Sequence, residues 1–104
     1  MDNAAIGLIR PGVTARDVDL YALAAMHGYR LVFTVEMDTT NPLLAMHGLA
    51  RHAAEWGARA VAVPDFAHCR DIFDLITENA VLVTPGDVYP RGYRWPPVSN
   101  KPIA

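Results

Sequence analysis

The sequence has few of the features that identify a chemical class. Its 104 residues include a single cysteine, Cys69, so an internal disulfide is excluded and a reducing compartment is favoured. The chain has nine Lys and Arg residues and eleven Asp and Glu residues. This slightly negative balance gives no general attraction to nucleic acid or to anionic membranes.

Long apolar runs are also missing. No stretch approaches the roughly 20 residues of a membrane-spanning helix, and Met1–Asn3 begins neither a basic nor an apolar signal region. We therefore expect a cytoplasmic protein with no membrane partner. An apolar fraction of 52% and a charged fraction of 19% are typical of one folded domain.

No metal or cofactor site is predicted. His47 and His52 are five residues apart on one expected helix, about 140° around its axis, so they cannot share a metal ion. Cys69 has no His or Asn in a recognisable catalytic arrangement, and we expect a buried structural thiol there.

Short apolar runs alternate with segments of helical period along most of the chain. The runs that predict strands are Ala5–Ile9, Leu31–Val35, Ala60–Val63 and Ala80–Val83. Such alternation predicts a parallel sheet with helices on both faces. We expect a three-layer α/β sandwich whose mainly parallel, four-stranded sheet has the flavodoxin-like strand order 2-1-3-4.

Capping signals place helices between these strands. Thr14, with Asp17 three residues later, predicts a helix start, and Gly28 predicts the end of that helix. The pair Asn41-Pro42 predicts the start of a second helix, which Trp56-Gly57 ends. A third helix is expected from a cap at Asp65 to Glu78-Asn79.

The composition changes at Pro85, because five of the eight prolines lie between Pro85 and Pro102. We expect an α/β domain over residues 1–84 and an extended tail over residues 85–104. The tail interleaves aromatic residues with arginines: Tyr89, Arg91, Tyr93, Arg94 and Trp95. Such residues can stack on bases or contact a protein partner, and we favour intramolecular packing or a partner surface. Nucleic-acid binding is expected to be weak and non-specific, because few cations serve it.

Several short motifs follow the element order. They are Gly7-Leu8-Ile9-Arg10-Pro11-Gly12, Gly28-Tyr29, Asp38, Asn41-Pro42 and Asp65-Phe66-Ala67-His68-Cys69. In this order the chain resembles the N-terminal catalytic domain of serine recombinases, the resolvase/invertase family, over about residues 4–84. That family reads Gly-Tyr-x-Arg-Val-Ser at the first strand, Gly-Tyr after the first helix, Asp after the second strand, Arg-Pro at the next helix and Asp-Arg-Leu-x-Arg after the third strand.

Departures from that family remove its chemistry. The nucleophilic serine corresponds to Gly12, the helix-opening arginine to Asn41, and the two later arginines to Phe66 and Cys69. Strand transfer needs a covalent nucleophile and several cations around the phosphodiester. The resemblance therefore implies a degenerate module with no catalytic residue and no recombinase activity.

Polar residues at the expected carboxyl ends of the strands form the remaining candidate site. They are Arg10, Gly12, Asp38, Asp65 and His68. Ligands of such sheets bind at this edge, and Gly12 would let a phosphate approach the backbone, so these residues are anion-binding candidates. Alternatively, Arg10 and Asp65 form an ion pair, or Asp65 caps its own helix.

Two functions stay open. The first is a non-catalytic binding or regulatory module acting through protein–protein contacts, as a homodimer or with another protein. Its Ala-rich helices, Thr14–His27 and Pro42–Trp56, offer surfaces for close packing. The alternative is a small anion- or nucleotide-binding sensor or enzyme that uses the strand-end crevice.

Overall fold

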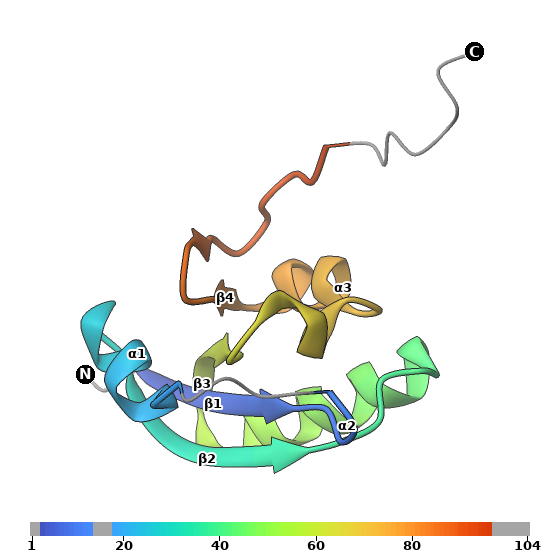
Figure 1. The fold of residues 1–104 in the computed structure, drawn as a ribbon, viewed down its shortest axis with the longest axis horizontal. Helices are drawn as coiled ribbons and strands as arrows, with labels where there is room; N and C mark the ends of the chain where they lie inside the picture. Colours follow the sequence, from blue (N-terminus) through green and yellow to red (C-terminus); the bar gives the residue numbers. More distant parts are fainter. Residues whose placement is uncertain (1–2, 14–17, 97–104) are drawn as a thin grey trace.

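The computed structural model describes residues 3–13 and 18–96. Its sheet has the strand order β2-β1-β3-β4-β5, and most of these strands are labelled in Figure 1. The parallel strands are β1 (Ala4–Ile9), β2 (Arg30–Glu36), β3 (Ala58–Ala62) and β4 (Val81–Val83). The two-residue strand β5 (Val88–Tyr89) runs antiparallel to β4.

The predicted α/β architecture and the order 2-1-3-4 of the first four strands are confirmed. The prediction of four strands is wrong, because β5 adds a fifth. This strand comes from the segment that we expected to be an extended tail. It lies between Pro85 and Pro90 and is too short to produce a visible alternation of apolar and polar residues.

Helices cover both faces of the sheet. The helix α1 (Leu20–Met26) packs over one face, where a small core gathers around alanines of β1 and β3. The opposite face carries a larger core beneath α2 (Pro42–Trp56), the 3₁₀ helix η1 (Phe66–Cys69) and α3 (Phe73–Asn79). This arrangement fits the predicted three layers.

β1 explains why the two cores differ in size. Ile6 and Leu8 are fully buried in the larger core, whereas Ala5 belongs to the smaller one. Gly7 follows the same alternation, since a Cβ there would lie 2.8 Å from Thr34 Oγ1 and 2.9 Å from Leu20 Cδ1. Small residues on this face therefore let α1 approach the sheet closely.

The helix α2 has its predicted ends. The Asn41 side chain accepts a hydrogen bond from the Leu44 N–H (3.3 Å) at its start. At its end, Gly57 adopts the left-handed conformation with φ 63°. Both signals act within a few residues of the helix end, which is why the sequence alone reveals them.

The start that we predicted for the first helix is wrong. Val18 and Asp19 are not helical, and the Asp19 carboxylate accepts a hydrogen bond from the Ala22 N–H (3.1 Å) as the N-cap of α1. The predicted caps Thr14 and Asp17 lie outside the described residues. Asp19 directly precedes the apolar run that begins at Leu20, whereas Thr14 is further from it in the sequence. An N-cap must adjoin the first helical turn, so Asp19 takes that position.

The third expected helix is divided in two. Asp65 is a cap as predicted, but it caps η1, through a hydrogen bond from the Ala67 N–H (2.9 Å). The chain then turns, and α3 begins only at Phe73. The turn allows Cys69 and Ile72 to be fully buried in the same core, a tertiary requirement that overrides the helical period.

The residues after β5 dock on α3. Trp95 Nε1 donates a hydrogen bond to Thr77 Oγ1 (2.7 Å), and the Gly92 N–H donates to the Thr77 carbonyl (2.6 Å). The Trp95 ring meets the Phe73 ring edge-on, with centroids 4.5 Å apart. It also contacts the rings of Phe66, Tyr89 and Tyr93. This aromatic cluster agrees with the interpretation of intramolecular packing.

We predict that Gly7→Ala destabilises the protein by about 1–3 kcal/mol, because the added methyl group forces α1 away from β1. Urea unfolding followed by circular dichroism measures this change. Gly86→Ala is the matched control, since a Cβ at Gly86 meets nothing within 4 Å. Equal midpoints for the two variants would contradict the close approach of α1.

We predict that Trp95→Ala lowers the free energy of unfolding by about 2 kcal/mol or more, because it removes the ring contacts with Phe66 and Phe73 that dock this segment on η1 and α3. Trp95→Phe keeps a ring but loses the hydrogen bond to Thr77, and should cost about 1 kcal/mol. Arg94→Ala, at an exposed neighbouring position, serves as the control. Unchanged stability of Trp95→Ala would show that the segment is not docked in solution.

Candidate functional site

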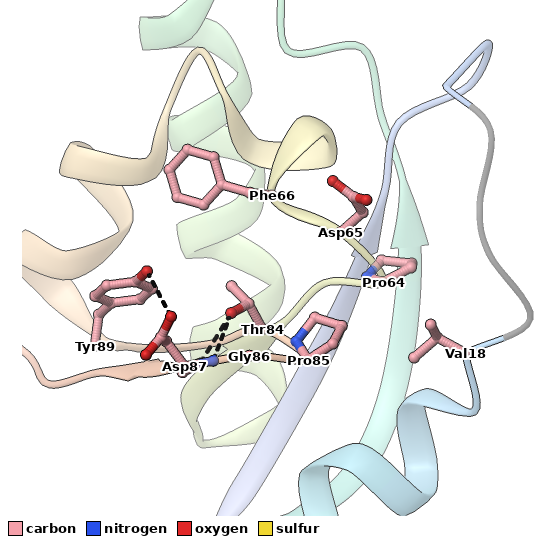
Figure 2. A pocket seen from close by; sticks show the side chains of 9 residues that line it. All are labelled: Val18, Pro64, Asp65, Phe66, Thr84, Pro85, Gly86, Asp87 and Tyr89. Atoms are coloured by element: carbon pink, nitrogen blue, oxygen red, sulfur yellow. Dashed lines mark hydrogen bonds between the residues drawn. The ribbon is translucent and has the colours of Figure 1, made fainter.

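A cavity of about 340 Å³ lies at the carboxyl ends of β3 and β4 (Figure 2). Pro64, Asp65 and Phe66 line it after β3, residues 84–87 line it after β4, and Val18 and Tyr89 complete it. Its position is where ligands bind in open parallel sheets. Of the described residues, two carboxylates and no cationic side chain line the cavity, an arrangement that does not suit an anion.

The second carboxylate of the cavity belongs to Asp87 and lies on the β4 side. Its backbone is held by the Thr84 hydroxyl, which donates to the Asp87 carbonyl (3.0 Å) and accepts from the Asp87 N–H (3.1 Å). The Tyr89 hydroxyl donates to the Asp87 carboxylate at 3.4 Å, as Figure 2 shows. Burial, followed by the charge of Asp87, raises the pKa of Tyr89.

Arg10, the expected cation, is neutralised within the fold. Its guanidinium donates to Asp71 at 2.9 Å, and this ion pair is partly shielded from solvent. No local pattern in the sequence marks Asp71 as the partner of Arg10. Only the fold brings it to the end of β1, and its carboxylate now occupies the place that an anionic ligand would take.

His68 also has a structural contact. The side chain is fully buried, and its Nδ1 accepts a hydrogen bond from the Arg10 backbone N–H (3.0 Å). The neutral ring therefore carries its proton on Nε2, an atom with no hydrogen-bond partner among the described residues. This contact ties η1 to the end of β1, and burial keeps the ring away from any ligand in the crevice.

Gly12 and Asp38 lie in local turns. Gly12 has φ 87° in the turn that the Val13 N–H closes on the Arg10 carbonyl (3.2 Å). Asp38 is exposed and accepts a hydrogen bond from the Thr40 N–H (2.9 Å). Thr40, and to a smaller extent Arg10, lowers the pKa of the Asp38 carboxyl. Of the five anion-binding candidates, only Asp65 lines the cavity.

No three His, Cys, Asp or Glu side chains are grouped to hold a metal ion in the part of the chain that the structure describes. Within the same residues, no helix has both the length and the apolar character needed to cross a bilayer.

Protein-family models, curated proteins and solved structures show no significant match to this chain. The resemblance to serine recombinases therefore stays a prediction based on short motifs.

Two surface features were not anticipated from the sequence. Phe33 of β2 and Trp56 of α2 stack on the outside of the molecule. At the amino edge of the sheet, Arg59 and Arg91 line a second cavity. Alternation along the chain marks strands, but it does not reveal which strand is at an edge or which arginines converge.

Cys69 is fully buried, and its thiol donates to the Phe66 carbonyl at 3.3 Å. Burial, with a contribution from Asp65, raises the pKa of Cys69 to about 12. A folded thiol is then protonated at pH values where an unfolded thiol, with a pKa near 8.5, has lost its proton. The free energy of unfolding should therefore fall as the pH rises from about 8.5 towards 12.

We predict that Cys69 reacts with an aromatic disulfide reagent at pH 8 only as fast as the protein opens. The measurement is the labelling rate in increasing urea, compared with the rate of the fully unfolded chain. A native-state rate near that of the unfolded chain would show an accessible thiolate and contradict the buried thiol.

Proposed function

We propose that this protein is a non-catalytic binding module that acts through protein–protein contacts, and that its partner is a second copy joined along β2. The observation that carries the proposal is an exposed edge strand bordered by an exposed aromatic stack. The polar residues of the strand-end crevice support the non-catalytic part, because Arg10 is paired with Asp71 and His68 is buried.

β2 has the length and position for pairing with another chain. It lies at the outer edge of the sheet (Figure 1), and β1 is its only strand neighbour among the described residues. The Met37 N–H donates to the Ile9 carbonyl, so with alternating directions the backbone groups of Thr34 and Glu36 point away from β1. Such outward groups are a template for a further strand.

The side chains beside this edge suit an interface. Phe33 is 36% exposed and Trp56 47% exposed, and their rings stack with centroids 5.5 Å apart. The His52 ring also contacts the Phe33 ring, with centroids 5.4 Å apart. Exposed aromatic residues on an ordered surface are enriched at protein interfaces.

Charge favours a second copy as the partner. β2 begins with Arg30 and ends with Glu36. In an antiparallel two-fold pair, the Arg30 end of each β2 would lie beside the Glu36 end of the other copy. The irregular register of β2 lies around Val32, so only Phe33–Glu36 keep the regular alternation, and Arg30 contributes through its charge rather than through backbone pairing.

We predict a dimer by sedimentation equilibrium, weakened by either Arg30→Glu or Glu36→Arg, because each places like charges opposite one another. The double variant Arg30→Glu/Glu36→Arg should restore the dimer, since it again brings opposite charges together at both ends of the pair. Glu78→Arg, a charge reversal at an exposed position of α3, controls for net charge. A monomeric wild-type protein, or a double variant as weak as the singles, would contradict the proposal.

The alternative is a small sensor or enzyme that uses the strand-end crevice, and the cavity in Figure 2 is the observation in its favour. Its acidic lining and the pairing of Arg10 speak against an anionic ligand there. Heat-shift screening with nucleotides and phosphorylated metabolites separates the two functions. A ligand-induced shift that is lost in Arg10→Ala would favour the sensor or enzyme.

A further inference from the structure

The amino edge of the sheet holds a cavity of about 500 Å³, at the opposite end of the strands from the crevice. Arg59 at the start of β3 and Arg91 beyond β5 line it, together with Tyr29 and Asn79. We propose that this cavity binds a small phosphorylated ligand through the guanidinium groups of Arg59 and Arg91. This site goes beyond the proposed function, because it does not involve the outer edge of β2.

The charge of the cavity favours an anion. Among the residues that the structure describes, its lining includes two arginines and no Asp or Glu. Neither arginine has an ion-pair partner within residues 3–13 and 18–96, in contrast to Arg10 with Asp71. Arginine donates two parallel hydrogen bonds to a phosphate, and two arginines around one cavity can share the charge of a phosphate dianion.

The backbone of β3 places Arg59 in a special position. Ala58 and Ala60 pair with Ala4 and Ala5, which are consecutive in β1, so Arg59 is the extra residue of an irregular register. An extra residue in a strand redirects its side chain from the regular alternation. The irregularity lies at the start of the strand, where Arg59 reaches the cavity.

Arg91 is held by a turn of the backbone. The turn spans Pro90–Tyr93, and the Tyr93 N–H closes it by donating to the Pro90 carbonyl (2.9 Å). Gly92 within it has φ 83°. The Gly92 N–H donates to the buried Thr77 of α3, which also accepts the Trp95 hydrogen bond. These two bonds anchor the turn after Arg91, and the pairing of Tyr89 with Leu82 of β4 holds the chain before it. A preorganised cation loses little freedom on binding.

A structural role for these arginines has a different consequence. Cations are favourable near helix C-termini, and Gly57 and Asn79 mark the C-terminal ends of α2 and α3. If this interaction were their whole role, replacing either arginine would reduce stability without changing the affinity for any anion. The experiment therefore measures affinity and stability separately.

The test is a titration with inorganic pyrophosphate at constant ionic strength, followed by amide chemical shifts. We expect saturable shifts at Asn3, Arg59, Asn79 and Gly92. Arg59→Gln and Arg91→Gln should each weaken the affinity by about tenfold or more, as expected for the loss of a charge-assisted contact. The matched control Arg94→Gln removes the same charge from an exposed position that does not line the cavity.

Equal weakening by all three variants would show non-specific attraction and overturn the site. So would the absence of a saturable shift, or a loss of stability in Arg59→Gln and Arg91→Gln with unchanged affinity. The same titration on Glu36→Arg keeps the two proposals apart, because binding of pyrophosphate should not depend on the state of the β2 edge.

Discussion

The alternation of large and small side chains along β1 is the constraint on which the rest of the structure depends. Ile6 and Leu8 fill the core beneath α2 and α3, while Ala5 and Gly7 make room for α1 on the other face. Because β1 lies between β2 and β3, it places every other parallel strand directly or through a neighbour. A larger residue on its small face would displace both α1 and β2, since Thr34 of β2 contacts the same space.

The distribution of charge over the two edges of the sheet follows from this arrangement. At the carboxyl edge, Arg10 is paired with Asp71, and two carboxylates line the adjoining cavity. At the amino edge, two arginines line a cavity to which no Asp or Glu of the described residues contributes. A protein with a formal net charge of −2 thus brings two cations together at one cavity. Net charge describes the whole surface, whereas recognition depends on the few groups that surround one cavity.

Thr77 connects the C-terminal segment to these features. Its hydroxyl accepts the Trp95 hydrogen bond, and its carbonyl accepts that of Gly92. These contacts complete the aromatic cluster over η1 and α3, and they also hold the turn that carries Arg91. The same segment supplies β5, which covers one edge of the sheet. β2 is left at the other edge, and the interface that we propose is located there.

Local signals in the sequence determined the strand–helix alternation and both ends of α2, whereas the order of the first four strands was expected by analogy with flavodoxin-like sheets. The alternation and the helix ends depend on residue size, β-branching and capping within a few positions, so the sequence alone predicts them. The tertiary structure decided which polar groups meet. Asp71 is 61 residues from Arg10, and His68 is 58 residues from it. Trp95 reaches Thr77 across 18 residues, and Arg59 and Arg91 converge only because β3 begins at the edge of the sheet where the turn after β5 lies. Such pairings depend on how whole elements pack, and no local pattern of side chains specifies them.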